Sequence, residues 1–354
     1  MVATLALCDR CGLVNVHVVH LVATDAFAGV ERYLTYTAPA QANAGLRVTV
    51  VGGEPTRMRA ALDGSAVSFA PYGGPVAAIR RVRQCQADIV HVHMTTAELL
   101  AAVGARRDGR VVSTRHFAQL RGSSAPARAA GRLASARIAQ QIAISEYVAA
   151  RVEGECVVVP NAVPNRSLGP HDEQIVLVAQ RLEREKDTAT AIRAWAASRL
   201  ADDGWTMVIA GRGAQHAEVD DLARQLGVSG SIDVVGFADD LADRMGRASI
   251  LLATAPSEPF GLSVVEAMAC GLPVVAAAGG AHLETVGAVT PRSLFPPGDH
   301  DAAAALLREI ADDSEHRASD GSQLQAHQRR ELDVATHARR LNDVYEAVLR
   351  SSTR

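Results

Sequence analysis

The sequence is poor in aromatic residues and in cysteine, and neither sign of charge dominates it. Aromatic residues make up 4% of the 354 residues, so the cores must be built from Ala, Val, Leu and Ile. The net charge of −3 argues against a general nucleic-acid-binding protein, whose surface would need a cationic excess. No stretch approaches eighteen uninterrupted apolar residues, and no basic-then-apolar leader pattern opens the chain. We therefore expect a soluble, cytoplasmic protein.

The five cysteines are an odd number and mostly scattered, which suits reduced thiols rather than a disulfide framework. Cys8 and Cys11 form an isolated C-x-x-C pair. A zinc site would need a second ligand pair nearby, but His17 and His20 fall inside an apolar alternation that is typical of a strand. We therefore predict incidental thiols and no metal site.

Short apolar runs alternate with amphipathic stretches of helical length along the whole chain. Strands separated by helices of about ten to fifteen residues predict βαβ units and parallel sheets. The proline-containing segment 160–174 interrupts this rhythm, because proline disfavours continuation of both helix and sheet. The expected strands include Val16–Val22, Ile89–His93, Val111–Thr114, Ile142–Ile144, Ile175–Ala179, Thr206–Ala210 and Ile250–Ala253.

These elements predict an α/β protein of two doubly wound, Rossmann-like domains that face each other across a cleft. The first domain is expected over residues 1–165 and the second over residues 166–333. The amphipathic segment 334–354 is a C-terminal helix that is a candidate to pack back on the first domain. Ligands of such sheets bind at the carboxyl ends of the strands, so we expect the site in the cleft.

The most specific segment is 257–274, Ser-Glu-Pro-Phe-Gly-Leu-Ser-Val-Val-Glu-Ala-Met-Ala-Cys-Gly-Leu-Pro-Val. It follows a predicted strand and leads into a helix that begins near Gly261. The amides of Phe260, Gly261 and Leu262 lie at the unsatisfied N-terminus of this helix. Backbone N–H groups and the helix dipole there favour an anion or an oxygen-rich sugar.

Two glutamates accompany this helix terminus. Glu258 lies in the turn before the helix, and Glu266 lies roughly one and a half turns into it. An isolated pair at this spacing is usually a first-turn acid and a surface residue. Glu266, however, lies within an otherwise apolar helix, where a carboxylate more often meets a ligand or a polar partner. We therefore predict that both glutamates accept hydrogen bonds from ligand hydroxyls.

At this point the chain resembles the family 4 retaining glycosyltransferases, which have the GT-B fold, through their donor-site signature. The likeness continues over Ala276–Glu284, where Gly279-Gly280 and Glu284 match the family's Gly-Gly-x-x-Glu. It spans most of Val16–Asp301. The resemblance implies a nucleoside-diphosphate sugar as co-substrate, held by the second domain, and an acceptor held mainly by the first. It implies no further cofactor.

The segment 180–187, Gln-Arg-Leu-Glu-Arg-Glu-Lys-Asp, follows the first strand of the second domain. Cations in a loop at the carboxyl edge of a sheet are well placed for a diphosphate. Since acidic residues are interspersed, a solvated charge run is the alternative. The resemblance assigns diphosphate binding to Arg181 and Lys186, which match the family's Arg and Lys.

In the first domain, a strand leads through Ala28-Gly29-Val30-Glu31-Arg32 into a helix N-terminus, which is again an anion or hydroxyl site. This loop resembles the family's Gly-Gly-x-Glu-Arg, with Gly29 retained and Ala28 in place of the first glycine. The alanine methyl narrows the approach of a ligand and disfavours a positive φ. We therefore expect the second domain, more than this loop, to contact the phosphates.

Three further histidines lie on or just after predicted strands of the first domain. His116 ends one strand and matches the family's histidine near the donor sugar and the acceptor, although a lone histidine at a strand end is more often structural. His91 and His93 share one face of another strand. A metal would need further ligands, so we interpret these two as cleft wall or core.

The segment 117–145 has no acidic residue. Such a segment suits an anionic acceptor or a membrane surface, but large apolar anchors are missing, which favours a mobile loop and a helix with solvated arginines. Peripheral membrane contact is therefore a secondary hypothesis, and no nucleic-acid partner is expected. Four arginines fall among its alanines: Arg121, Arg128, Arg132 and Arg137.

The resulting hypothesis is a retaining hexosyltransferase-type enzyme that moves a sugar to a hydroxyl of a glycan, a lipid or a small metabolite, without a metal. Arg181, Lys186 and the helix amides would stabilise charge on the departing diphosphate. Glu266 would hold the ribose hydroxyls and Glu258 the donor sugar. His116 would polarise or position groups at the sugar.

Two other functions stay open. One is a sugar-nucleotide epimerase on a similar scaffold, and the other is a catalytically silent sugar-nucleotide-binding protein. A nicotinamide-linked dehydrogenase is disfavoured, because no G-x-G-x-x-G follows the first strand of either domain.

Overall fold

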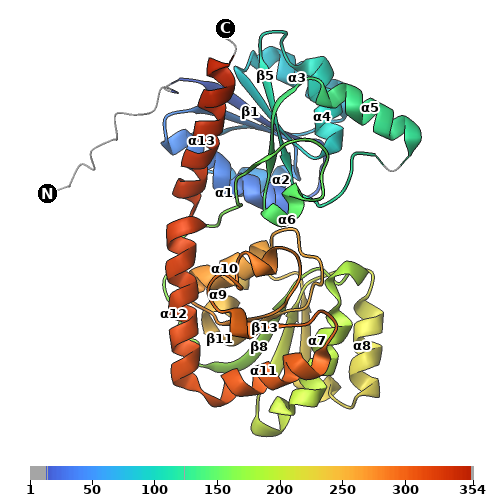
Figure 1. Cartoon of the computed structure of the whole chain (residues 1–354), viewed down its shortest axis with the longest axis vertical. Helices are drawn as coiled ribbons and strands as arrows, with labels where there is room; N and C mark the ends of the chain where they lie inside the picture. The colour runs from blue at the N-terminus through green and yellow to red at the C-terminus, as the bar shows by residue number, and fades with distance from the viewer. Residues whose placement is uncertain (1–12, 14, 123, 352–354) are drawn as a thin grey trace, which may run out of the picture. The chain divides into compact units, whose positions relative to one another are not determined.

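The computed structural model describes residues 13, 15–122 and 124–351, which form two compact units (Figure 1). Unit 1 takes in the described residues up to Ile144, Val148–Pro160, and those from Val334 onward. Unit 2 takes in Ser145–Tyr147 and Asn161–Asp333. Each unit is a parallel sheet covered by helices, which confirms the predicted architecture of two Rossmann-like domains. The C-x-x-C pair of Cys8 and Cys11 lies outside the described residues.

The described part of unit 1 holds a seven-stranded parallel sheet in the order β3-β2-β1-β4-β5-β6-β7. The chain extends the sheet in one direction from β1 and in the other from β4, so the topological switch point lies between these two strands. The strands are β1 (His17–Val22), β2 (Arg47–Val51), β3 (Ser68–Ala70), β4 (Ile89–His93), β5 (Arg110–Arg115), β6 (Ile138–Ala143) and β7 (Val157–Val158).

The helices of unit 1 form two groups. One group consists of α3, α4 and α5, each in contact with the next, and the other joins α1 to α2 and α13. Their bounds are α1 (Gly29–Asn43), α2 (Pro55–Leu62), α3 (Pro75–Cys85), α4 (Thr95–Gly104), α5 (Ala125–Ser135) and α13 (Val334–Arg350), with the short α6 (Glu146–Ala149) at the boundary between the units.

Unit 2 holds a six-stranded parallel sheet in the order β10-β9-β8-β11-β12-β13, with its switch point between β8 and β11. The strands are β8 (Glu173–Ala179), β9 (Thr206–Ala210), β10 (Ile232–Gly236), β11 (Ala248–Ala253), β12 (Val274–Ala277) and β13 (Leu294–Phe295). The helices are α7 (Thr188–Ser198), α8 (His216–Gln225), α9 (Leu241–Arg247), α10 (Leu262–Cys270), α11 (His300–Asp312) and α12 (Ser314–Glu331).

The cores follow from the scarcity of aromatic residues. The central strands are buried along their length, as expected for parallel sheets with helices on their faces. One core cluster of unit 1 is made of buried Val, Leu and Ala alone. The main cluster of unit 2 is also largely aliphatic, with Trp195, Trp205 and Phe295 as its aromatic members.

The arginines of segment 117–145 do not share one environment, and the expectation of solvated arginines is wrong for Arg121. The Nε of Arg121 lies 2.6 Å from Oε2 of Glu98, a buried carboxylate on α4. The hydroxyl of Ser113 on β5 donates to the same carboxylate. Because a buried carboxylate requires a partner, this ion pair fixes the loop after β5 to α4. The other three, Arg128, Arg132 and Arg137, are exposed.

Candidate functional site

The carboxyl ends of β8 and β11 lie side by side at the switch point of unit 2. Segment 180–187 follows β8, and segment 254–261 follows β11 and leads into α10. Ligands of doubly wound sheets bind at this position, where two neighbouring loops diverge to opposite sides. The predicted site residues of unit 2 come from these two loops and from α10.

Lys186 and Glu258 form a direct ion pair at this switch point. Nζ of Lys186 lies 2.5 Å from Oε2 of Glu258, and the two side chains are only 16% and 13% exposed. Burial alone would raise the pKa of Glu258, but the Lys186 ammonium, the neighbouring His282 and the amide of Phe260 together lower it. Glu258 is therefore ionised at neutral pH, and a cation and an anion from two distant loops converge on one point.

The main chain at Lys186 is held in place by two polar side chains. The amide of Gln180 and the hydroxyl of Thr254 each donate to the carbonyl oxygen of Lys186, both over 3.0 Å. Thr254 follows β11 directly and is fully buried. No sequence motif singles out either residue. They tie the loop after β8 to the loop after β11 and so fix where the ammonium can reach.

The Gly279-Gly280 step explains how the loop of Glu258 is held. The amide of Ala281 donates to the carbonyl oxygen of Glu258 over 2.8 Å. A Cβ on Gly279 would lie 2.1 Å from the carbonyl oxygen of Pro256, and one on Gly280 would lie 2.2 Å from that of Glu258. Gly280 also has a positive φ of 60°. Only glycine allows two backbone segments to approach this closely.

Helix α10 begins where the sequence predicts, with Gly261 as its N-cap residue in the left-handed region (φ 85°). The amide of Phe260 contributes to the lowered pKa of the Glu258 carboxylate, so this amide already acts on an anionic group of the protein itself. The amides of Gly261 and Leu262 belong to the helix terminus, whose first N–H groups have no partner within the helix. Glu266 is buried within α10.

Arg181 does not join the pair formed by Lys186 and Glu258. Its guanidinium forms an ion pair with Glu185 over 2.7 Å, and both side chains are more than half exposed. An exposed pair of this kind contributes little to stability, so Glu185 can be exchanged for another anion at low cost.

His282 is a further polar residue of this site that the sequence reading had missed. Its Nδ1 donates to the carbonyl oxygen of Ala277 over 3.0 Å, so the neutral ring keeps an acceptor at Nε2. Nε2 lies 3.5 Å from where a Cβ on Gly261 would stand. Burial lowers the pKa of His282, although neighbouring Glu258 favours its charged form.

In unit 1, the backbone conformation at Ala28 does not require a glycine, although the family has glycine at this position. Ala28 is the N-cap residue of α1 with an extended φ of −133°, which any residue adopts. The carboxylate of Glu31 folds back and accepts from the amide of Ala28 over 2.7 Å. Gly29 begins the helix and is exposed.

His116 lies directly after β5 and is buried. Its Nε2 lies 3.0 Å from Nδ1 of His93. Burial lowers the pKa of His116 to about 3, so the ring is neutral at pH 7. His91 and His93 are fully buried within the unit, which agrees with their interpretation as core residues.

Lys186 is the only lysine in the sequence. The chain has 36 Lys and Arg residues, and every other one is arginine. A lysine differs from arginine in offering a compact, strongly hydrated charge on a flexible stem. In a chain that otherwise uses arginine, the lone lysine stands at the switch point of unit 2. This count is a sequence signal that could have singled out the residue independently of any motif.

Both units match known families. Residues 161–323 match the model described as glycosyl transferases group 1, and residues 27–165 match glycosyltransferase family 4. The 2-deoxystreptamine glucosyltransferase of Streptomyces kanamyceticus is 34% identical over 137 residues, which are 38% of this chain and 35% of that protein. The D-inositol 3-phosphate glycosyltransferase of Corynebacterium kroppenstedtii is 35% identical over 142 residues, 39% of this chain. That alignment covers 31% of the relative, so the matched part spans about a third of each.

Solved structures share the fold over nearly the whole chain. Anabaena HepE in complex with UDP and glucose superposes with a TM-score of 0.78 at 19% identity, over 93% of this chain and 99% of that one. AviGT4, a glycosyltransferase involved in avilamycin A biosynthesis, gives a TM-score of 0.73 at 19% identity, over 95% and 98%. The two family matches show that the chain belongs to the family 4 glycosyltransferases, and the similar structures show the GT-B fold.

Proposed function

We propose that this protein is a retaining glycosyltransferase that moves a sugar from a nucleoside-diphosphate sugar to an acceptor hydroxyl without a metal ion. The observation that carries the proposal is the pairing of the lone lysine, Lys186, with Glu258 at the switch point of unit 2. The UDP and glucose bound by HepE, a protein of the same fold, support a donor of this class.

In the proposed reaction, the bond between the anomeric carbon and the diphosphate oxygen breaks, and a bond to the acceptor oxygen forms on the same face. The acceptor's proton passes to the departing phosphate. Lys186 and the amides at the start of α10 would stabilise the charge that develops on the diphosphate, which is electrostatic catalysis by fixed groups. Arg181 would join them by exchanging Glu185 for phosphate.

The carboxylates would position the donor. Glu258 accepts hydrogen bonds from hydroxyls of the donor sugar while Lys186 bridges to the phosphate. Glu266 would hold the ribose hydroxyls, and Gly29 would let the loop of unit 1 approach the ligand. Fixing the reacting atoms in this way removes an entropic part of the barrier.

The direct test is whether free nucleoside diphosphate is released only when an acceptor is present. Acceptors for the first panel are 2-deoxystreptamine and inositol phosphates, the compounds named for two relatives. We expect acceptor-dependent release together with a glycosylated product. An epimerase would instead change the sugar nucleotide with no acceptor added, and a silent binding protein would bind the donor without any turnover. Either result would contradict the proposal.

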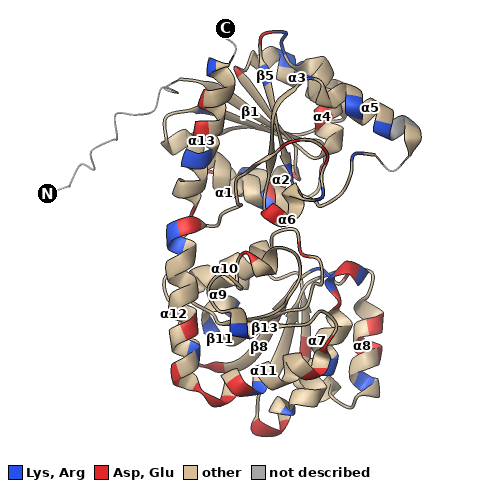
Figure 2. Cartoon of the chain, in the orientation of Figure 1, with Lys and Arg blue, Asp and Glu red and all other residues tan. Residues whose placement is uncertain are grey.

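We also propose that unit 1 contacts an anionic membrane surface through helices α3, α4 and α5. The only acidic residue on these helices is Glu98, which is buried and paired with Arg121. Figure 2 shows arginines on α5 in blue. A cluster of about four to eight basic residues is typical of a surface that binds anionic lipids. The exposed arginines of the three helices are Arg80, Arg81, Arg83, Arg128 and Arg132.

Apolar side chains accompany these arginines. Leu133 on α5 and Leu120 in the preceding loop are 76% and 63% exposed, so apolar anchors are present. A groove of about 550 Å³ beside α3 and α4 is lined by Val76, Val103 and their neighbours. Among the described residues of unit 1, the exposed large apolar side chains other than Val157 all lie on these helices or this loop: Val76, Leu99, Val103, Phe117, Leu120 and Leu133.

Among the described residues, no helix combines the length and the apolar character that crossing a bilayer requires. The proposed contact is therefore peripheral, with apolar side chains reaching the interface and arginines facing anionic headgroups.

We expect the protein to co-sediment with vesicles that contain anionic phospholipid, and not with purely zwitterionic ones. Each basic residue near such a surface contributes about 1 kcal/mol, so replacing Arg80, Arg81 and Arg83 together by glutamine should weaken binding roughly a hundredfold. The matched control replaces three exposed arginines of unit 2, Arg199, Arg224 and Arg330, and should leave binding unchanged. Equal loss in both variants, or binding to soluble acidic proteins but not to vesicles, would refute the membrane contact.

A further inference from the structure

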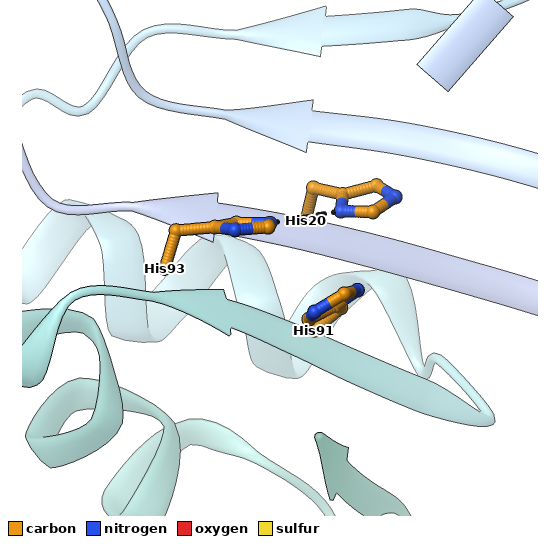
Figure 3. Close-up of side chains that lie close together, drawn as sticks. All are labelled: His20, His91 and His93. Atoms are coloured by element: carbon orange, nitrogen blue, oxygen red, sulfur yellow. Dashed lines mark hydrogen bonds between the residues drawn. The ribbon is translucent and has the colours of Figure 1, made fainter. Parts of the chain in front are cut away.

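Unit 1 contains a cluster of histidines on neighbouring strands of its sheet. His20 comes from β1, while His91 and His93 come from β4, and the three rings lie side by side (Figure 3). Their centroids are 4.6 to 5.3 Å apart, and all three side chains are fully buried. His116, after β5, lies next to His93. Because these four imidazoles are buried, their polar nitrogens require hydrogen-bond partners within the protein.

Three of these rings form one hydrogen-bonded chain that begins at a glutamine of α1. The side-chain oxygen of Gln41 lies 2.7 Å from Nε2 of His20. Nδ1 of His20 lies 3.0 Å from Nε2 of His93, and Nδ1 of His93 lies 3.0 Å from Nε2 of His116. The chain therefore runs from Gln41 through His20 and His93 to His116, the histidine that the family resemblance places near the sugar.

The rings of this chain are neutral at pH 7. Burial lowers the pKa of His20 to about 4 and that of His116 to about 3, and it also lowers the pKa of His93. A neutral imidazole has one N–H donor and one acceptor nitrogen. Each ring of the chain must therefore donate to one neighbour and accept from the other, and the direction at one end determines the direction at every link.

Gln41 sets that direction. Its amide oxygen can only accept, so Nε2 of His20 carries the hydrogen and Nδ1 of His20 is an acceptor. His93 then donates from Nε2 and accepts at Nδ1. His116 consequently donates from Nε2, and its Nδ1 is left as the nitrogen with a free lone pair.

Helix α13 in turn orients Gln41. The amide nitrogen of Gln41 donates to the hydroxyl of Tyr345 over 3.1 Å. That hydroxyl lies 2.7 Å from Nδ1 of His91, whose Nε2 lies 2.6 Å from the hydroxyl of Thr114. Since Tyr345 accepts from Gln41, it donates its own hydrogen to His91, and His91 donates to Thr114. The second branch therefore continues the same direction through the fully buried Tyr345.

The three buried histidines also have the composition of a metal site, because one nitrogen of each lies within 4.8 Å of the others. All six ring nitrogens of His20, His91 and His93, however, already have a hydrogen-bond partner. A metal ion would have to replace several of these bonds, so the geometry favours the hydrogen-bonded chain.

We propose that Gln41 and Tyr345 are positioning residues that hold His116 as the Nε2–H tautomer, so that its Nδ1 accepts a hydrogen bond from a hydroxyl group of the bound sugar or acceptor. The inference rests on the proposed function for the identity of that hydroxyl. An Nδ1–H tautomer would require a carbonyl or phosphate oxygen instead. The hydrogen-bonded chain ends at the side-chain amide of Gln41, which cannot take up a proton at neutral pH. The hydrogen bonds therefore orient His116 and do not store the acceptor's proton.

The tautomer can be read directly by NMR on protein labelled with ¹⁵N-histidine, because protonated and unprotonated imidazole nitrogens resonate far apart. The signals of His116 are assigned by their loss in His116→Gln. We expect a protonated Nε2 and an unprotonated Nδ1. Gln41→Met removes the acceptor at the head of the chain and should give a mixture of tautomers at His116. Gln41→Glu keeps an acceptor there and should restore the single tautomer.

A second variant and a control guard against a general loss of structure. Tyr345→Phe removes only the hydroxyl that orients Gln41, and it should also mix the tautomers. His17→Gln is the matched control: His17 is a buried histidine of the same strand that contacts Cys85 and Thr49 and lies outside the chain. Transfer by Gln41→Met should fall roughly tenfold in kcat with an unchanged KM for the donor, as for the loss of one oriented hydrogen bond.

The inference would be overturned by a protonated Nδ1 of His116 in the unaltered protein, or by an unchanged tautomer in Gln41→Met. A stoichiometric shift of the His20, His91 and His93 signals by Zn²⁺ would also overturn it in favour of a metal site. The spectra need no substrate. Failure of the proposed function would appear separately, as absence of acceptor-dependent transfer with the His116 tautomer as expected.

Discussion

Replacing Lys186 with alanine should lower kcat/KM for the sugar-nucleotide donor by about 100- to 1000-fold, the usual loss when one fixed group that stabilises developing charge is removed. The ammonium is a largely buried cation at the proposed donor site, and Glu258 holds it in place. Steady-state release of nucleoside diphosphate in the presence of acceptor measures the effect. Lys186→Arg should recover only part of the rate, because a planar guanidinium does not fit the space of a compact ammonium.

Loss of the ammonium also leaves the Glu258 carboxylate largely buried without its partner, so stability has to be measured beside activity. Lys186→Ala should unfold at a lower denaturant concentration than the unaltered protein. Adding Glu258→Gln removes the unpaired charge and should recover stability without recovering transfer. Arg199→Ala, at an exposed arginine of the same unit, should affect neither quantity. If Lys186→Ala retained a rate within about threefold of the unaltered protein, its catalytic role would be excluded.

Gly280→Ala should lower the free energy of unfolding by about 4 kcal/mol, an effect that is exceptional for a single methyl group. The new Cβ would stand 2.2 Å from the carbonyl oxygen and 2.5 Å from the amide nitrogen of Glu258, at a residue with positive φ. The loop that carries Glu258 must move to relieve this contact, so transfer should be lost even where the protein stays folded. Chemical denaturation and the transfer assay measure the two effects.

Gly298→Ala is the matched control for this prediction. Gly298 also has a positive φ, of 82°, but a Cβ there would meet nothing within 4 Å. The substitution should therefore cost only the backbone strain, roughly 1 to 2 kcal/mol, and leave transfer intact. Equal losses for the two variants would mean that the backbone conformation, and not the contact with Glu258, sets the requirement for glycine.

The sequence pattern predicted the central strands closely because parallel strands buried on both faces are continuous apolar runs. The ranges Ile89–His93 and Thr206–Ala210 match β4 and β9 residue for residue. The sequence pattern did not predict the edge strands β3 and β13. Strands of three and two residues are too short to show an alternating pattern. Strand β6 begins four residues before the predicted Ile142, because its first half is half-buried or exposed and β7 pairs only with its last two residues.

Motif spacing located both loops of the candidate site, but it could not show what holds them. Gln180 and Thr254 fix Lys186 across 6 and 68 residues of sequence, and no local pattern predicts such contacts. The same holds for Arg121, which looks solvated among alanines until the fold brings Glu98 to it. Burial depends on which segments meet in space, and composition does not encode that.

We propose that Lys186 and Glu258 form the diphosphate-sugar end of the donor site. Because Lys186 is the only lysine, reductive ¹³C-methylation marks one side chain besides the terminal amine and keeps its charge. Titration with a nucleoside diphosphate should move this lysine signal saturably, whereas the nucleoside alone should leave it in place. Saturable binding of the diphosphate with an unmoved lysine signal would contradict the account.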